Sequence, residues 1–165
     1  MSARYAKAMG FKVIGLDIND DMLSIVKHNG ADAVFNTRSN PTFAKEVKQL
    51  AQGKRGNHGV DAVAVYSDAS PAYETAQQVL KINGTLMCIG LPKKPLEFAA
   101  FPVVTNAFNI RGSNTGTPKE AKKAVDFTIE HGIIPEVEFR KLEEVPQMYA
   151  EMEAGKAKRR MAVVF

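Results

Sequence analysis

The stretch that most constrains the fold is residues 11–20, Phe-Lys-Val-Ile-Gly-Leu-Asp-Ile-Asn-Asp. Apolar residues occupy both alternating sets of positions, which is typical of a strand buried on both faces of a parallel sheet. We predict this strand at residues 12–17, with Asp17 at its carboxyl end and Asn19 as the N-cap of the helix that follows. Ligands of open α/β sheets bind at carboxyl ends of strands, so Asp17 is the first candidate binding residue.

Strands and helices alternate along the rest of the chain. Further strands are predicted at residues 33–35, 60–66, 85–90, 108–112, 137–140 and 161–165. One intervening helix is expected to begin at Asn40-Pro41, and another to begin at Ser70-Pro71 and end at Asn83-Gly84. This alternation indicates parallel β-α-β units, and therefore an α/β fold with a doubly wound parallel sheet. The length of 165 residues predicts a single domain, 1–165.

Composition excludes several classes of protein. The net charge of +4 is mostly spread along the chain, so no nucleic-acid partner is predicted. A single cysteine excludes an internal disulfide and suits a reducing compartment. No apolar run approaches the roughly 20 residues of a membrane span, so we expect no membrane contact and a cytoplasmic protein.

Two further motifs were weighed as binding sites. Residues 53–59, Gly-Lys-Arg-Gly-Asn-His-Gly, lack the Lys-Ser/Thr ending of a phosphate-binding P-loop and precede a strand, so we interpret them as a turn. Cys88 and the three histidines show no metal-ligand spacing, so no metal site is predicted and Cys88 is interpreted as a buried strand residue.

Short stretches along the whole chain resemble one family, the zinc-type alcohol dehydrogenases of the medium-chain dehydrogenase/reductase group, and most closely its NAD-dependent microbial members. The matching stretches lie at residues 5–10, 15–17, 27–32, 59–62, 83–85, 89–92, 112–113 and 152–155. The resemblance implies an oxidoreductase. Residues 1–116 resemble an incomplete NAD-binding domain, and residues 117–165 resemble the C-terminal return segment.

In that family a catalytic domain carries the zinc ligands, and the first Rossmann strand and its G-x-G-x-x-G turn follow it. The present sequence starts in the helix after that turn. The resemblance therefore implies a truncated, Rossmann-like sheet without its first strand and glycine-rich turn, without zinc ligands, and with weak or vestigial NAD binding. Either the strand at 12–17 pairs directly with the one at 60–66, or another chain fills the gap. We expect no zinc-dependent alcohol oxidation by this chain alone.

The resemblance also assigns cofactor contacts to individual residues. Asp17 matches the acid that accepts hydrogen bonds from the adenosine ribose and repels a 2′-phosphate, which favours NAD over NADP. The remaining matches are Ser67, Ile89, Gly90 and Leu91 near the nicotinamide riboside, Ser113, Asn114 and Thr115 near the carboxamide, and Arg160 near the pyrophosphate. Core packing explains the apolar residues equally well, and a solvated charge run explains Arg160 equally well.

Three functions follow as alternatives. The first is the NAD-binding portion of an alcohol-dehydrogenase-like oxidoreductase. The second is a metal-free, non-redox enzyme that uses the nicotinamide pocket for another small-molecule ligand, with Tyr66 and Asp68 as candidate catalytic residues. The third is a non-catalytic dimeric binding module. In each case the resemblance implies a homodimer through the edge strand 108–112.

Overall fold

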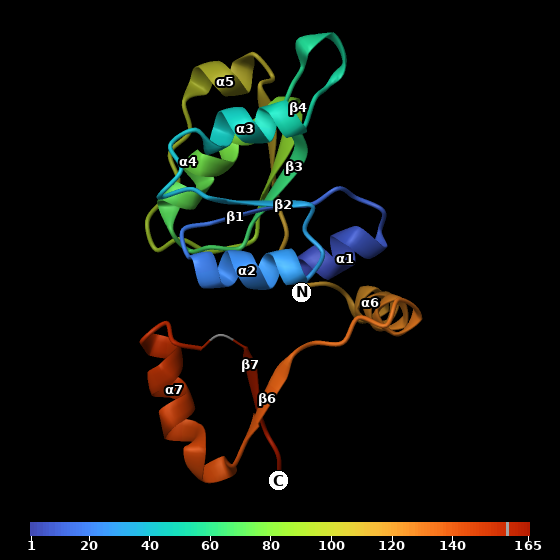
Figure 1. The fold of residues 1–165 in the computed structure, drawn as a ribbon, viewed down its shortest axis with the longest axis vertical. Coiled ribbons are helices and arrows are strands. Elements are labelled where there is room, and N and C mark those ends of the chain that lie inside the picture. The colour runs from blue at the N-terminus through green and yellow to red at the C-terminus, as the bar shows by residue number, and fades with distance from the viewer. Residues whose placement is uncertain (158) are drawn as a thin grey trace. The chain divides into compact units, whose positions relative to one another are not determined.

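The computed structural model describes residues 1–157 and 159–165 (Figure 1). The chain divides into two compact units, which are described separately below. The first contains residues 1–15, 19–34 and 118–165, and the second contains residues 16–18 and 35–117. The single domain expected from the sequence stays a prediction. No helix in the described part of the chain is long and apolar enough to span a membrane.

The predicted strand ending at Asp17 is present as β1 (Ile14–Asp17), and it pairs with β2 (Ala33–Asn36) in a two-stranded sheet. The Asp32 amide donates to the Val13 oxygen at 2.8 Å, and the Thr37 amide donates to the Asp17 oxygen at 2.9 Å, so the strands run parallel. Helix α1 (Ser2–Ala8) precedes β1, and α2 (Asp20–His28) connects the two strands. The predicted N-cap of α2 is confirmed, because the side-chain oxygen of Asn19 accepts the Asp21 amide at 2.8 Å.

A three-stranded parallel sheet forms the centre of the second unit. Its strands β3 (Val60–Val65), β4 (Leu80–Cys88) and β5 (Phe108–Gly112) lie in the order β3-β4-β5. Helix α4 (Ser70–Val79) connects the first two, and α5 (Ala100–Val104) precedes the third. Helix α3 (Phe43–Leu50) and the 3₁₀ turn η1 (Lys54–Gly56) precede β3 in the chain. The buried core consists of Val65, Tyr73, Ala76, Leu80, Leu86 and Phe108.

The central strand of the expected doubly wound sheet has no counterpart in the described strand pairings. In the described chain, β1 pairs with β2, and β3 pairs with β4, but β1 and β3 belong to separate sheets. Direct pairing between the strands at 12–17 and 60–66 is therefore not what the structure shows. Both strands keep an edge whose main-chain groups are not used in a described ladder.

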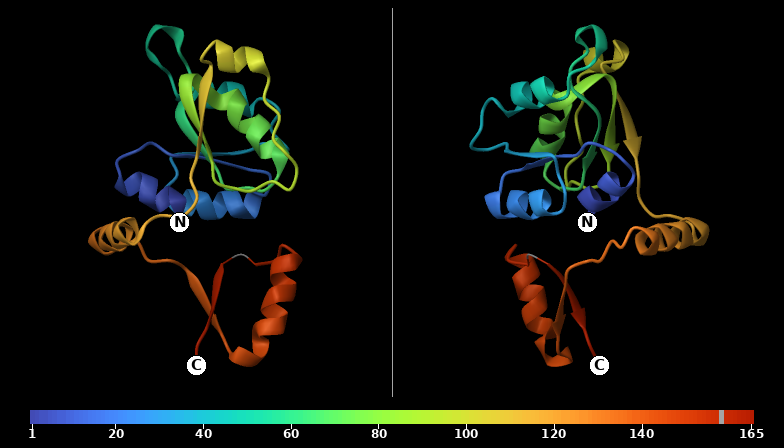
Figure 2. Two further views of the ribbon diagram at one scale, coloured as in Figure 1. Left: turned by 180° about the vertical axis from the view of Figure 1, so that it is seen from behind. Right: turned by 45° about the vertical axis from the view of Figure 1, so that its right-hand side comes forward.

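The C-terminal part of the first unit begins with α6 (Pro118–Glu130) and continues to a third, two-stranded parallel sheet of β6 (Val137–Arg140) and β7 (Arg160–Val163). Between these strands the chain passes through the 3₁₀ turn η2 (Leu142–Glu144) and α7 (Val145–Glu153), as Figure 2 shows. Arg140 ties this segment together through ion pairs with Glu138, Glu144 and Glu151.

Two predicted helix boundaries are wrong. Helix α3 begins at Phe43, because Asn40 serves a preceding turn: its side-chain oxygen accepts the Thr42 amide at 2.9 Å. Helix α4 ends at Val79 instead of Asn83-Gly84, because the next residue already pairs with Val60 in the parallel ladder. Asn83 takes a left-handed backbone, with φ of 62°, in the bulge that this early start creates.

Candidate functional site

The carboxyl edge of the three-stranded sheet collects most of the predicted site residues. Because β3, β4 and β5 are parallel, the segments that follow them leave the sheet at the same edge. These segments contain Tyr66, Ser67 and Asp68 after β3, Ile89, Gly90 and Leu91 after β4, and Ser113, Asn114 and Thr115 after β5. The structure therefore brings these residues to one edge, in the place where open α/β sheets bind ligands.

Close main-chain contact holds the first two segments together. The Val65 oxygen accepts hydrogen bonds from the amides of Ile89 at 3.1 Å and Gly90 at 2.9 Å. A Cβ atom on Gly90 would lie 2.0 Å from the Ser67 oxygen, far inside van der Waals contact. Only glycine therefore lets the segment after β4 approach the segment after β3 this closely.

The buried residue Tyr73 supports this edge from the core, although no sequence motif marked it as a site residue. Its hydroxyl donates to the Gly90 oxygen at 2.7 Å, and its side chain is 1% exposed. Burial, and to a smaller extent the neighbouring Cys88, raises the pKa of Tyr73, so the phenol stays a protonated donor. Its signal in the sequence was the spacing of Tyr73, Ala76 and Val79, which places it on the buried face of α4.

The side chains at the edge itself face solvent. Tyr66 is 59% exposed and Leu91 is 82% exposed, and Ser67 and Asp68 are exposed as well. The Ser67 hydroxyl oxygen accepts the Ala69 amide at 3.1 Å, which fixes the turn into α4. The exposed hydroxyl groups and aromatic ring at this edge can contact a ligand. The catalytic role of Tyr66 and Asp68 stays a prediction.

The third segment leaves β5 with its polar side chains exposed. The Ser113 amide donates to the Cys88 oxygen at 3.0 Å, which continues the β4–β5 ladder by one hydrogen bond. Asn114 and Thr115 follow with exposed side chains and no regular secondary structure. Cys88 itself is half-buried, and burial raises the pKa of its thiol, so it is a packed strand residue and a poor nucleophile.

Asp17 and Arg160 belong to other sheets than this edge. Asp17 is half-buried at the end of β1, where the turn after β2 closes over it: the Thr37 amide donates to its main-chain oxygen, and the Asn36 side chain donates to the Ile18 oxygen at 3.3 Å. Arg160 is exposed and begins β7 in the first unit. Within the described residues, no cluster of three or more His, Cys, Asp or Glu side chains is arranged to hold a metal ion.

Known proteins share this fold and sequence. The alcohol dehydrogenase of Geobacillus stearothermophilus is 35% identical over 164 residues. The solved alcohol dehydrogenase of Aeropyrum pernix superposes with a TM-score of 0.83 at 24% identity, and a solved NAD-dependent alcohol dehydrogenase does so with a TM-score of 0.80 at 22% identity. Each match covers 99% of this chain.

The same matches cover 46% of each relative, so the chain spans about half the length of the alcohol dehydrogenases that it resembles. The shared part has the Rossmann-like fold that the sequence predicted. Residues 1–130, well over half of the chain, match the zinc-binding dehydrogenase family. The chain therefore belongs to the zinc-binding dehydrogenase family and corresponds to about half of an alcohol dehydrogenase.

Proposed function

We propose that this chain supplies the NAD-binding part of an alcohol-dehydrogenase-like oxidoreductase and binds the coenzyme along the carboxyl edge of its sheets. The observation that carries the proposal is the edge of β3, β4 and β5. There Gly90 packs closely against the main chain of Ser67 and accepts a hydrogen bond from Tyr73. A solved relative of the same fold is an NAD-dependent alcohol dehydrogenase, which supports this choice of coenzyme.

The residues present fit the parts of a dinucleotide. Asp17 would accept hydrogen bonds from the adenosine ribose, and Ser67 with the main chain of residues 89–91 would contact the nicotinamide riboside. The exposed segment 113–115 offers main-chain and side-chain donors and acceptors that suit a carboxamide. The contact between Arg160 and the pyrophosphate, which the resemblance implies, stays a prediction. When bound, NAD supplies the hydride acceptor that an alcohol oxidation needs.

The affinity of this chain alone should be low. Its sequence contains no G-x-G-x-x-G motif, so the run of main-chain amides that such a turn offers to the pyrophosphate is not among its residues. Each hydrogen bond to a charged acceptor contributes about 1.5–3 kcal/mol, so the loss of several weakens binding to the millimolar range.

Amide-resolved NMR tests where the coenzyme binds. Titration of the labelled chain with NAD to about 10 mM should move the amide signals of Ser67, Gly90 and residues 113–115, in the range where a millimolar Kd gives measurable occupancy. The amides of α7 serve as an internal control and should stay in place. Movement confined to α7, or no movement at all, would reject the proposed site.

We also propose that two copies pair through β5. The outer edge of this strand is open in the described sheet order, and an open edge strand invites pairing with another chain. Ile110 is 42% exposed on this strand, whereas Phe108 is 7% exposed and belongs to the core. Ile110 is therefore the apolar side chain that an isologous contact would cover.

Two alternatives remain from the sequence: a metal-free reaction at Tyr66 and Asp68, and a non-catalytic binding module. No observation favours either of them over the coenzyme-binding proposal, because the side chains of both Tyr66 and Asp68 are exposed. We propose the cytoplasm as the location, where NAD is available and the single cysteine stays reduced.

A further inference from the structure

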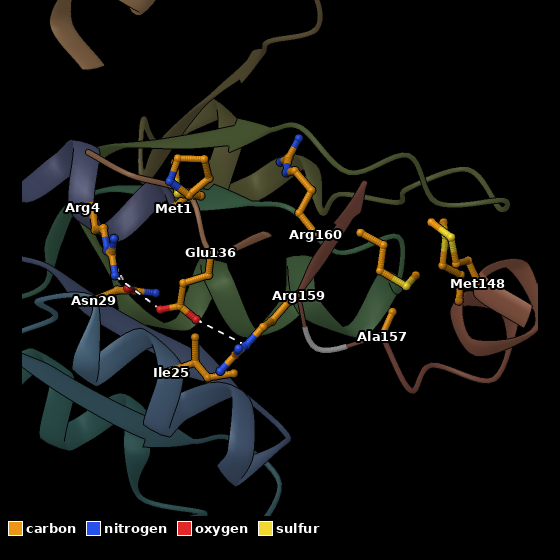
Figure 3. A pocket seen from close by; sticks show the side chains of 12 residues that line it. Met1, Arg4, Ile25, Asn29, Glu136, Met148, Ala157, Arg159 and Arg160 are labelled. Atoms are coloured by element: carbon orange, nitrogen blue, oxygen red, sulfur yellow. Dashed lines mark hydrogen bonds and ion pairs between the residues drawn. The ribbon is translucent and has the colours of Figure 1, made fainter. Parts of the chain in front are cut away.

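The first unit contains a hollow of about 500 Å³ that the coenzyme-binding proposal does not explain (Figure 3). Its walls come from α1, the end of α2, the segment before β6, helix α7 and the start of β7. This volume lies within the range of small-molecule sites, which are mainly apolar and carry a few polar groups that fix the ligand's orientation. The chemistry of its two ends identifies the class of ligand.

One end of the hollow is positively charged. Glu136 pairs with two guanidinium groups: its Oε1 lies 3.5 Å from Arg4 Nη2, and its Oε2 lies 3.5 Å from Arg159 Nε. Two cations therefore share one carboxylate, which leaves an excess positive charge at this end. Figure 3 shows the three side chains converging, with Asn29 beside them.

Arg4 and Arg159 have different parts in this end. Arg4 is fixed, because its Nε donates to the Asn29 side-chain oxygen and its Nη1 donates to the Ile134 main-chain oxygen, each at 2.7 Å. Arg159 makes its described ion pair through Nε alone, and its side chain is 61% exposed. Outside that ion pair, the guanidinium of Arg159 has two terminal nitrogens in the planar arrangement that binds a carboxylate through two parallel hydrogen bonds.

The other end of the hollow is apolar. The lining of the hollow includes Met148, Met152, Met161 and Ala157. Figure 3 shows Met148 and Ala157 on the side of the hollow away from Arg4 and Asn29. Methionine side chains are flexible and polarisable, so they adapt to the shape of a flexible apolar chain. Met152 is 59% exposed, and a bound apolar chain would cover it.

We propose that this hollow is a binding site for an unbranched aliphatic carboxylate. The carboxylate binds the terminal nitrogens of Arg159 within the positive end, and the alkyl chain lies along the methionines. Arg160, which also lines the hollow, adds to the positive field. Apart from Arg160, which the resemblance assigns to the pyrophosphate, the hollow shares no residue with the proposed coenzyme site, and variants of Arg159 and Met152 test it separately.

Calorimetric titration of the full 165-residue chain with sodium decanoate, below its micelle concentration, tests this proposal. We expect saturable binding of one decanoate per chain. Arg159→Gln should weaken it about tenfold or more, while Lys156→Gln, which removes the same charge three residues away and does not line the hollow, should leave the affinity unchanged. Decanol, with the same chain and no charge, should bind at least tenfold more weakly.

The apolar end is tested by a second pair of variants. Met152→Glu should abolish binding, because it places a like charge and a hydrated group along the alkyl chain, whereas Met9→Glu at a methionine of similar exposure, 57%, should not. Far-UV circular dichroism checks that all variants fold. Absent saturable binding, equal binding of decanol, or a decanoate affinity that Arg159→Gln and Met152→Glu both leave unchanged would each overturn the proposal.

Discussion

The Tyr73 hydroxyl donates a hydrogen bond of 2.7 Å to the main-chain oxygen of Gly90. This contact joins the buried face of α4 to the segment that leaves β4 at the candidate coenzyme edge. The Gly90 amide donates a second hydrogen bond, to the Val65 oxygen at 2.9 Å. Gly90 is thus held by α4 through its oxygen and by β3 through its amide. The shape of the edge depends on both contacts.

Tyr73→Phe should lower the free energy of unfolding by about 1 kcal/mol, because the Gly90 oxygen loses its donor while the ring still fills the core. Urea unfolding followed by circular dichroism measures this change. Tyr149→Phe is the matched control, since the ring of Tyr149 is 65% exposed, and it should change the stability little. Equal effects of the two substitutions would contradict the structural importance of this hydrogen bond.

Gly90→Ala should destabilise the chain by about 2 kcal/mol or more, because the new Cβ would lie 2.0 Å from the Ser67 oxygen and the backbone must move. Gly112→Ala provides the comparison: a Cβ at that position meets nothing within 4 Å, so we expect a small effect. Thermal unfolding of both variants is sufficient. A Gly90→Ala variant as stable as Gly112→Ala would show that the two segments are not in close contact.

Glu144 makes part of the stability depend on pH. The Lys141 amide, which donates to this carboxylate at 2.8 Å, and the Arg140 guanidinium hold the pKa of Glu144 below its ordinary value of 4.5. A carboxyl with a depressed pKa in the folded state contributes stability that is fully present above pH 4.5 and is lost as the pH falls through the folded pKa. Glu144→Gln should therefore reduce stability at pH 7 and flatten its fall below pH 4.5.

Urea unfolding at a series of pH values from neutral to strongly acidic measures this effect. Glu143→Gln is the control, because the exposed side chain of Glu143 has no described bond to Arg140 and should leave the pH profile unchanged. If Glu144→Gln and the wild type lost stability equally below pH 4.5, the contacts of Glu144 with Lys141 and Arg140 would not contribute to the pH dependence of stability.

The sequence predicted most of the element order, since local patterns fix it. The strand at 108–112 is confirmed at both boundaries, because it follows from apolar residues bounded by turn residues. Asn40 was misread because asparagine satisfies a turn as well as a helix N-cap, and its Nδ2 donates to Glu46 across the start of the helix at 3.1 Å. Local pattern alone does not choose between these uses.

The end of α4 and the contacts of the site depend on tertiary structure. Leu80 leaves the helix because Val60 is available to pair with it, and no helix-stop signal at Leu80 announces this. The carboxyl edge could be predicted residue by residue, because parallel strands place their ends together. The anchoring of Gly90 by Tyr73 could not, because it joins residues 17 positions apart through a core that must first be packed.

Ile110→Lys tests the proposed dimer. A charged side chain on an edge strand opposes pairing with a second chain, so the variant should be a monomer where the wild type is a dimer. Ile129→Lys, at an isoleucine that is 74% exposed on α6, should leave the mass unchanged. Multi-angle light scattering at low micromolar concentration distinguishes the outcomes. A wild-type monomer, or a dimer that survives Ile110→Lys, would reject β5 as the interface.

The most direct test of the central claim is calorimetric titration of NAD and NADP into the wild type and Asp17→Ala. We predict millimolar binding of NAD, weaker binding of NADP because Asp17 repels a 2′-phosphate, and a loss of this preference together with at least tenfold weaker NAD binding in the variant. NAD affinity that Asp17→Ala leaves unchanged, or equal affinities of the wild type for NAD and NADP, would contradict the proposed role of this chain.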